Sequence, residues 1–134
     1  MKKDPAVYIR HIHDCILRIE AYVEEGRATF FNDHKTQDAV IRNLEVIGQA
    51  IKDLGTDRLS TEQPDIPWTQ IAGARNVLAH QYLGVDLNLI WNIVDQNLPA
   101  LKAAIRETAG RLAIDLSEPG DSNSIRSWTT STPR

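Results

Sequence analysis

Cysteine is almost absent from this sequence, since Cys15 is the only one in 134 residues. A single cysteine cannot form a disulfide within the chain, which favours a reducing compartment and excludes a small disulfide-stapled scaffold. Long uninterrupted hydrophobic runs are also missing, and the N-terminal residues soon become polar and charged. We therefore expect neither a membrane span nor a signal peptide, and we predict a cytoplasmic protein.

An excess of positive charge is missing too. The formal net charge is −3 and the isoelectric point is about 5.8. This charge argues against a protein that coats nucleic acid through a broad basic face. A few Arg or Lys side chains in a cleft can still hold one phosphate, so any contact with nucleic acid should be local.

Runs of alternating polar and apolar residues, which would indicate strands, do not occur. Apolar residues instead recur at steps of three and four, which is typical of amphipathic helices. The pattern predicts helices over residues 5–26, 36–54, 67–83 and 87–112, with Pro99 bending the last one. Residues 27–35 and 56–67 are expected to be connections. The predicted fold is all-α, an antiparallel up-and-down bundle of four main helices.

The length suits a single domain, which we place at residues 1–114. Residues 115–134 are rich in Ser, Thr and Pro without periodicity, and we expect them to form a flexible C-terminal tail.

The polar residues that can carry chemistry gather in one stretch, ARNVLAHQY, at residues 74–82. It contains Arg75, Asn76, His80 and Tyr82 within little more than two helical turns. Arg offers a planar fork of donors that fits phosphate, and His titrates close to neutral pH. On a helix Arg75 and Tyr82 lie about 20° apart, and Asn76 and His80 form a second close pair. Taken alone, the same residues also describe an ordinary solvated face.

This motif and two further stretches resemble a known family. The pattern R-x-x-x-x-H-x-Y, read here as Arg75, His80 and Tyr82, is similar to that of HEPN-family proteins, specifically the HepT toxins. Residues 42–54, RNLEVIGQAIKDL, and residues 65–76, DIPWTQIAGARN, are similar as well. The resemblance covers residues 5–112 and makes the predicted domain a HEPN-like bundle. Gln49 departs from the family, in which Glu is more usual, and this puts an interhelical ion pair or a site contact in doubt.

The resemblance implies an all-helical homodimer with metal-independent endoribonuclease activity and no cofactor. It implies a toxin of a type VII-like toxin-antitoxin pair. The implied partner is an antitoxin, a minimal nucleotidyltransferase of the MntA type, which silences the toxin by AMPylation of the motif tyrosine. By position that tyrosine is Tyr82.

The residue types fit this chemistry. RNA carries its own nucleophile, the 2′-hydroxyl, so the enzyme must remove its proton, stabilise charge on the phosphate and protonate the leaving oxygen. We assign Arg75 to the phosphate, His80 to proton transfer and Asn76 to orientation. Tyr82 is suited to stacking on a base when it is unmodified. The expected product is a 2′,3′-cyclic phosphate.

Other readings remain open from the residues alone. The chain could be a non-catalytic helical subunit that binds nucleotide or substrate for a nucleotidyltransferase partner, or a dimeric helical scaffold. His11 and His13 point about 160° apart on a helix and should not share a metal ion. Cys15 is expected to be a core residue rather than a reactive thiol. Glu20, Glu24 and Glu25 are most simply a solvated face, with an antitoxin contact as the lesser alternative.

Overall fold

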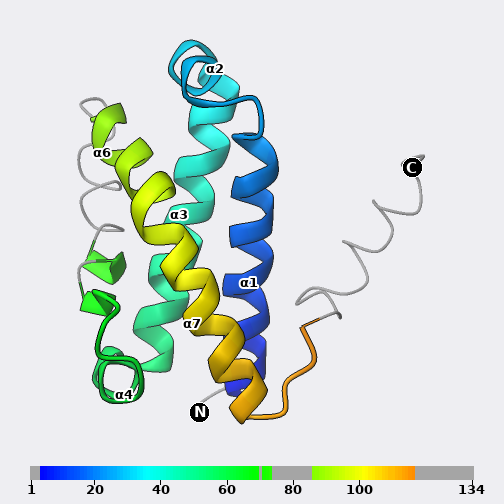
Figure 1. The fold of residues 1–134 in the computed structure, drawn as a ribbon, viewed down its shortest axis with the longest axis vertical. Coiled ribbons are helices and arrows are strands. Elements are labelled where there is room, and N and C mark those ends of the chain that lie inside the picture. Colours follow the sequence, from blue (N-terminus) through cyan, green and yellow to red (C-terminus); the bar gives the residue numbers. More distant parts are fainter. Residues whose placement is uncertain (1–3, 70, 74–85, 117–134) are drawn as a thin grey trace.

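The computed structural model describes residues 4–69, 71–73 and 86–116, and every regular element in them is a helix. The predicted all-α class is therefore confirmed. The elements are α1 (Pro5–Tyr22), α2 (Arg27–Asn32), α3 (His34–Leu54), α4 (Thr56–Glu62), α6 (Leu87–Asn92), the π-helical segment η2 (Ile93–Asn97) and α7 (Leu98–Arg111). In Figure 1 α1 and α3 stand side by side and α7 crosses in front of them, while α2 and α4 lie at opposite ends. Of the predicted tail, residues 115–134, all but the first two lie outside the described residues.

Acidic side chains begin three of these helices. Asp4 accepts a hydrogen bond from the amide of Ala6 at 3.0 Å, and Pro5 fills the first turn of α1. Asp33 caps α3 by accepting from the amide of Lys35 and from the hydroxyl of Thr36. These hydrogen bonds lower the pKa of Asp33, and the bond from Thr36 has the largest effect. Asp86 caps α6 in the same way.

Two segments expected to be connections are helical, so those predictions were wrong. Residues 27–35 contain α2, and residues 56–67 contain α4. Gly26 and Gly55, with φ of +101° and +105°, stand directly before the first residues of α2 and α4. Gly55 also ends α3, whereas α1 already ends at Tyr22. Each short helix buries one large side chain, Phe30 in α2 and Leu59 in α4. A single buried side chain cannot repeat at steps of three and four residues, so the hydrophobic pattern of the sequence did not indicate either α2 or α4.

The predicted fourth helix is present but is not α-helical throughout. It runs as α6, η2 and α7, and Pro99 lies in the first turn of α7 directly after the π-helical segment. Proline lacks the amide that would bond the carbonyl four residues earlier, and its ring crowds that carbonyl. The wider π turn accommodates both effects.

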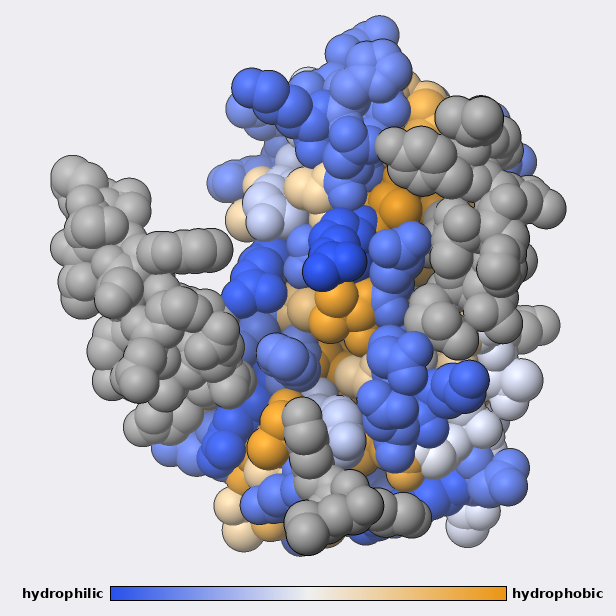
Figure 2. Space-filling model, turned by 180° about the vertical axis from the view of Figure 1, so that it is seen from behind, coloured by the Kyte–Doolittle hydropathy of each residue, from blue (hydrophilic) through white to orange (hydrophobic). Residues whose placement is uncertain are grey.

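The core lies where α1, α3 and α7 meet. Ile12, Ile16 and Ile19 of α1 and Ile47 and Ile51 of α3 are completely buried, and they are the bulky side chains of the stripes seen in the sequence. Most of the rear face in Figure 2 is hydrophilic, with a central band of hydrophobic side chains. None of the helices in the described part of the chain is long and apolar enough to cross a membrane.

A polar pair interrupts the apolar contact between α1 and α7. His13 is 4% exposed, and its Nε2 accepts a hydrogen bond from Nε of Arg106 at 3.4 Å. Burial lowers the pKa of His13 from its usual value of 6.5, and the positive charges of Arg106 and Lys102 lower it further. The negative charges of Asp14 and Glu20 raise this pKa, but their effect is smaller. Neither Nδ1 of His13 nor Oγ1 of Thr108 has a hydrogen-bond partner among the residues described. The fold therefore keeps the imidazole neutral.

This pair predicts that the protein is less stable in mild acid. The unfolded chain binds a proton at His13 near pH 6.5, whereas the folded chain binds it only at lower pH. The free energy of unfolding should therefore fall as the pH drops below about 6.5. Urea denaturation at pH 7.5 and at pH 5.5 measures this change in wild type and in His13→Leu.

The control for this prediction is His34→Gln, on the exposed first turn of α3. It should lose as much stability as wild type between the two pH values, while His13→Leu loses less. Equal losses in all three proteins would show that His13 does not set the pH dependence.

Candidate functional site

All four predicted site residues, Arg75, Asn76, His80 and Tyr82, lie outside the described residues. The structure describes the chain on both sides of them, up to residue 73 and again from Asp86. In Figure 1 the helical pieces at residues 68–69 and 71–73 and helix α6 lie on the same side of the bundle. The structure therefore shows how the two flanks of the motif, up to residue 73 and from Asp86 on, are held in the fold.

Trp68 anchors the flank that precedes the motif. Its side chain is 1% exposed, and its indole Nε1 donates to the carbonyl of Gln63 at 2.9 Å. The amide of Ile71 donates to the carbonyl of Pro67 at 3.0 Å, so the helix begins here, as predicted. Ile71 is buried as well. The helical turn that precedes the motif is thus fixed by two side chains in the core.

The loop before Trp68 is tied to the C-terminal end of α7. Nε2 of Gln63 donates to Glu107 at 2.9 Å, and Glu62 lies 3.6 Å from Arg111 and 3.6 Å from Arg58. Exposed pairs of this kind contribute little to stability individually. The contacts of Gln63 with Glu107 and of Glu62 with Arg111 connect this part of the chain to α7, which is itself packed in the core.

Asp86 fixes the flank that follows the motif. Its Oδ1 accepts from the amides of Asn88 at 2.9 Å and Leu89 at 3.4 Å, which satisfies two amides at the start of α6. Ile90, one turn further on, is fully buried. The motif is therefore connected to a capped and anchored helix at its C-terminal end as well.

The second stretch that resembles the family, residues 42–54, forms most of α3. Asn43 is buried and donates from Nδ2 to the carbonyl of Ala39 at 2.8 Å, and Gly48 is buried too. The departing residue, Gln49, is exposed and donates to Oδ1 of Asp53 at 3.0 Å. Gln49 thus makes a contact within its own helix. Arg42 is exposed.

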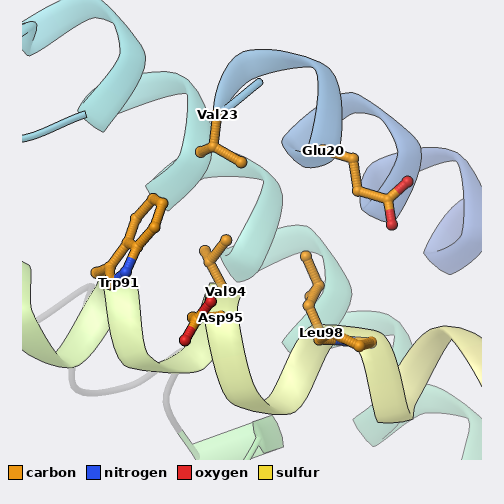
Figure 3. A pocket seen from close by; sticks show the side chains of 7 residues that line it. Glu20, Val23, Trp91, Val94, Asp95 and Leu98 are labelled. Carbon is orange, nitrogen blue, oxygen red and sulfur yellow. The ribbon is translucent and has the colours of Figure 1, made fainter. Parts of the chain in front are cut away.

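A pocket lies on another part of the bundle, between the end of α1 and η2 (Figure 3). Its volume is about 220 Å³, and it is lined by Glu20, Val23, Trp91, Val94, Asp95, Leu98 and Pro99. Sequence reasoning did not find it, because its residues come from two distant segments and share no motif. Two carboxylates at an apolar pocket disfavour a phosphate group, so we do not assign RNA to it. Glu20 is paired with Lys102 at 3.0 Å, so it is not simply solvated.

The remaining candidates have structural roles. His13 is buried, while His11 is only half-buried. Within residues 4–69, 71–73 and 86–116, no three His, Cys, Asp or Glu side chains are placed to hold a metal ion together. Cys15 is 1% exposed, and burial raises the pKa of its thiol to about 11, so it is a core residue as predicted.

Comparison with known proteins gives a consistent family. The family described as "Ribonuclease HepT-like" matches residues 12–108. A protein of Thermococcus cleftensis named "Probable ribonuclease HepT" is 40% identical over 103 residues, which cover 76% of this chain and 93% of that protein. No solved structure matches the chain.

A second relative is much longer than this chain. It is named "Gamma-glutamylcyclotransferase and putative RNase" and comes from Methanocaldococcus jannaschii. Identity is 41% over 106 residues, which cover 78% of this chain but only 47% of that protein. The similarity therefore concerns one part of the larger protein.

The anchoring of the first flank can be tested at Trp68. Replacing it with Phe removes the hydrogen bond to Gln63 and leaves unfilled volume in the core, so the free energy of unfolding should fall by about 1–3 kcal/mol. Urea denaturation measures that loss. Hydrogen exchange of peptides covering residues 66–82 should also become faster.

Trp91→Phe is the matched control, because it makes the same substitution at a half-buried tryptophan that lies against Phe30 in α6, the flank that follows the motif. It should leave exchange of residues 66–82 unchanged. Equal exchange in the two variants would contradict the anchoring role of Trp68.

Proposed function

The chain belongs to the ribonuclease HepT-like family, and from this membership we propose that it cleaves RNA as a metal-independent endoribonuclease. One observation carries the proposal. The family match, residues 12–108, includes the whole R-x-x-x-x-H-x-Y motif. The relative from Thermococcus cleftensis is named a ribonuclease, and the match covers nearly its whole length.

The proposed reaction uses the 2′-hydroxyl of the RNA as nucleophile. His80 removes its proton, Arg75 binds the phosphate as negative charge develops on its oxygens, and Asn76 orients one of these groups. Protonation of the 5′-oxygen by an imidazolium completes cleavage. The products are a 2′,3′-cyclic phosphate and a 5′-hydroxyl.

We propose that the active form is a homodimer. A single His80 cannot serve as base and acid in the same step, because the two roles require opposite protonation states. A second copy supplies a second imidazole if the two motif helices face each other. One His80 then acts as base and its mate acts as acid.

The proposed biological role is that of a toxin in a type VII-like toxin-antitoxin pair in the cytoplasm. The antitoxin is a minimal nucleotidyltransferase of the MntA type. The phenolic oxygen of Tyr82 attacks the α-phosphate of ATP, and pyrophosphate leaves. The attached AMP is bulky and negatively charged, so it obstructs the cleft and repels RNA phosphates. Modification then explains silencing without any change of fold.

Cleavage in EDTA tests the proposed reaction. The purified protein should cut total RNA and leave 2′,3′-cyclic phosphate ends. His80→Ala and Arg75→Ala should each reduce the rate by about 100-fold or more, since a general base or a charge-stabilising group is lost. His34→Ala, at an exposed His outside the motif, serves as the control and should cut normally.

The outcome has meaning only for folded protein, so circular dichroism accompanies each variant. Unmodified wild type that does not cut RNA would refute the nuclease proposal. Nucleotide binding without cleavage would then indicate a non-catalytic subunit.

Intact-mass measurement tests the modification. Incubation with ATP, Mg²⁺ and an MntA-type nucleotidyltransferase should add one AMP to each chain and stop RNA cleavage. Tyr82→Phe should gain no mass. Tyr22→Phe, at an exposed tyrosine of α1, should be modified like wild type. A mass gain on Tyr82→Phe would place the modification elsewhere.

A further inference from the structure

An arginine outside the motif is held in a fixed position next to the end of the motif segment. Arg27 is the first residue of α2, and its side chain is exposed. Its guanidinium carbon lies 4.5 Å from the centre of the Phe31 ring, within range of a cation–π interaction. Its Nη2 donates to Oδ1 of Asn88 at 3.3 Å. Two contacts thus orient a side chain that is usually mobile.

The support beneath Arg27 is rigid. The Phe31 ring packs edge-on against Phe30 at 5.3 Å, and Phe30 lies 5.5 Å from Trp91. Phe30 is completely buried, so this aromatic cluster fixes α2 to the core and to α6. Holding the guanidinium in place in advance reduces the entropy lost when it binds a ligand.

The charge of Arg27 is not neutralised by the described part of the protein. No carboxylate described in the structure lies within ion-pair distance of its guanidinium. Asp86 directs its carboxylate to the amides of α6 instead. Glu24 and Glu25 are exposed and precede α2 without pairing with Arg27. A guanidinium has five N–H donors, and Asn88 uses one of them.

The contact with Asn88 sets an upper limit on the distance between Arg27 and the proposed active site. Asn88 follows Tyr82 by six residues. Six residues of extended chain reach about 20 Å at most. Arg27 therefore lies no more than a few nucleotide lengths from the motif tyrosine, on a segment far from it in sequence.

We propose that Arg27 binds a phosphate of the RNA backbone beside the cleavage site. It does not touch the reacting atoms, so it is a positioning residue that fixes the substrate strand in the site. Its planar fork fits two oxygens of a phosphodiester. This inference rests on the proposed ribonuclease function and adds a substrate contact to it.

RNA affinity tests the proposal. Fluorescence anisotropy with a single-stranded RNA measures binding at several salt concentrations, in a His80→Ala background that prevents cleavage. Arg27→Met keeps an apolar side chain over Phe31 but removes the charge. It should weaken binding by about tenfold. It should also reduce the slope of log K against log salt by about 0.7, as expected for one lost phosphate contact on a single strand.

Two further variants separate charge from structure. Arg27→Lys keeps the charge and should keep most of the salt slope, with weaker binding because the fork is lost. Lys52→Met removes one positive charge from an exposed site in the last turn of α3, at the end of the bundle opposite α2 (Figure 1). It should bind RNA as tightly as the His80→Ala parent. If Arg27 only fastened α2 to α6, Arg27→Met would lower thermal stability without changing the salt slope.

Kinetics in the catalytically active background complete the test. Arg27→Met should raise KM for RNA and leave kcat nearly unchanged, since a remote phosphate contact contributes equally to ground state and transition state. If Arg27→Met binds and cleaves RNA as Lys52→Met does while wild type is active, the inference is wrong and the ribonuclease proposal stands. If wild type neither binds nor cleaves RNA, both are wrong.

Discussion

The packing of α1 against α3 is the contact on which the rest of the structure depends. Both helices carry an isoleucine-rich stripe, and Ile12, Ile16, Ile47 and Ile51 are completely removed from solvent. Burying a side chain of that size stabilises the fold by about 1.5–3 kcal/mol. α7 completes the core by packing on α1, and the short helices close the two ends (Figure 1). Elements with few buried groups of their own, such as α2 and α4, take their positions from this pair.

The same core positions both ends of the motif segment. Trp68 and Ile71 connect the residues before it to the interior, and Asp86 and Ile90 do so for the residues after it. Catalytic groups require rigid support, because an error of about 1 Å in their placement can reduce the rate substantially. The two anchored flanks thus hold both ends of the segment in which the predicted site residues lie. The pocket at η2, with its two carboxylates, is a separate feature.

The sequence predicted the parts of the fold that follow from periodicity. The stripes of α1 and α3 extend over several turns, and the caps at Asp4 and Asp86 belong to residue types that favour helix starts. The sequence did not predict the elements that form because of contacts between distant parts of the chain. α2 and α4 depend on one buried side chain each, and no local pattern reveals that Phe30 or Leu59 will find a place in the core.

In the candidate site, too, the residues that share a local pattern were predicted, and the one that depends on a contact between distant segments was not. Arg75, His80 and Tyr82 were found through spacing and resemblance, and they stay predictions, since they lie outside the described residues. Arg27 was missed, because its contacts with Phe31 and Asn88 bring together α2 and α6. Asn88 is 61 residues away in sequence. Only a folded chain reveals such a contact.

The π-helical segment η2 sets the rotational phase between the two halves of the last helix. Ile90, Val94 and Leu98 are buried at steps of four residues, a spacing that drifts by about 40° per step around an ideal α-helix. The wider turn at residues 93–97 absorbs this drift and keeps all three side chains toward the core. A chain one residue shorter there would turn α6 by about 100° relative to α7. The rotation of α6 relative to α7 therefore depends on the number of residues in η2 as much as on their identity.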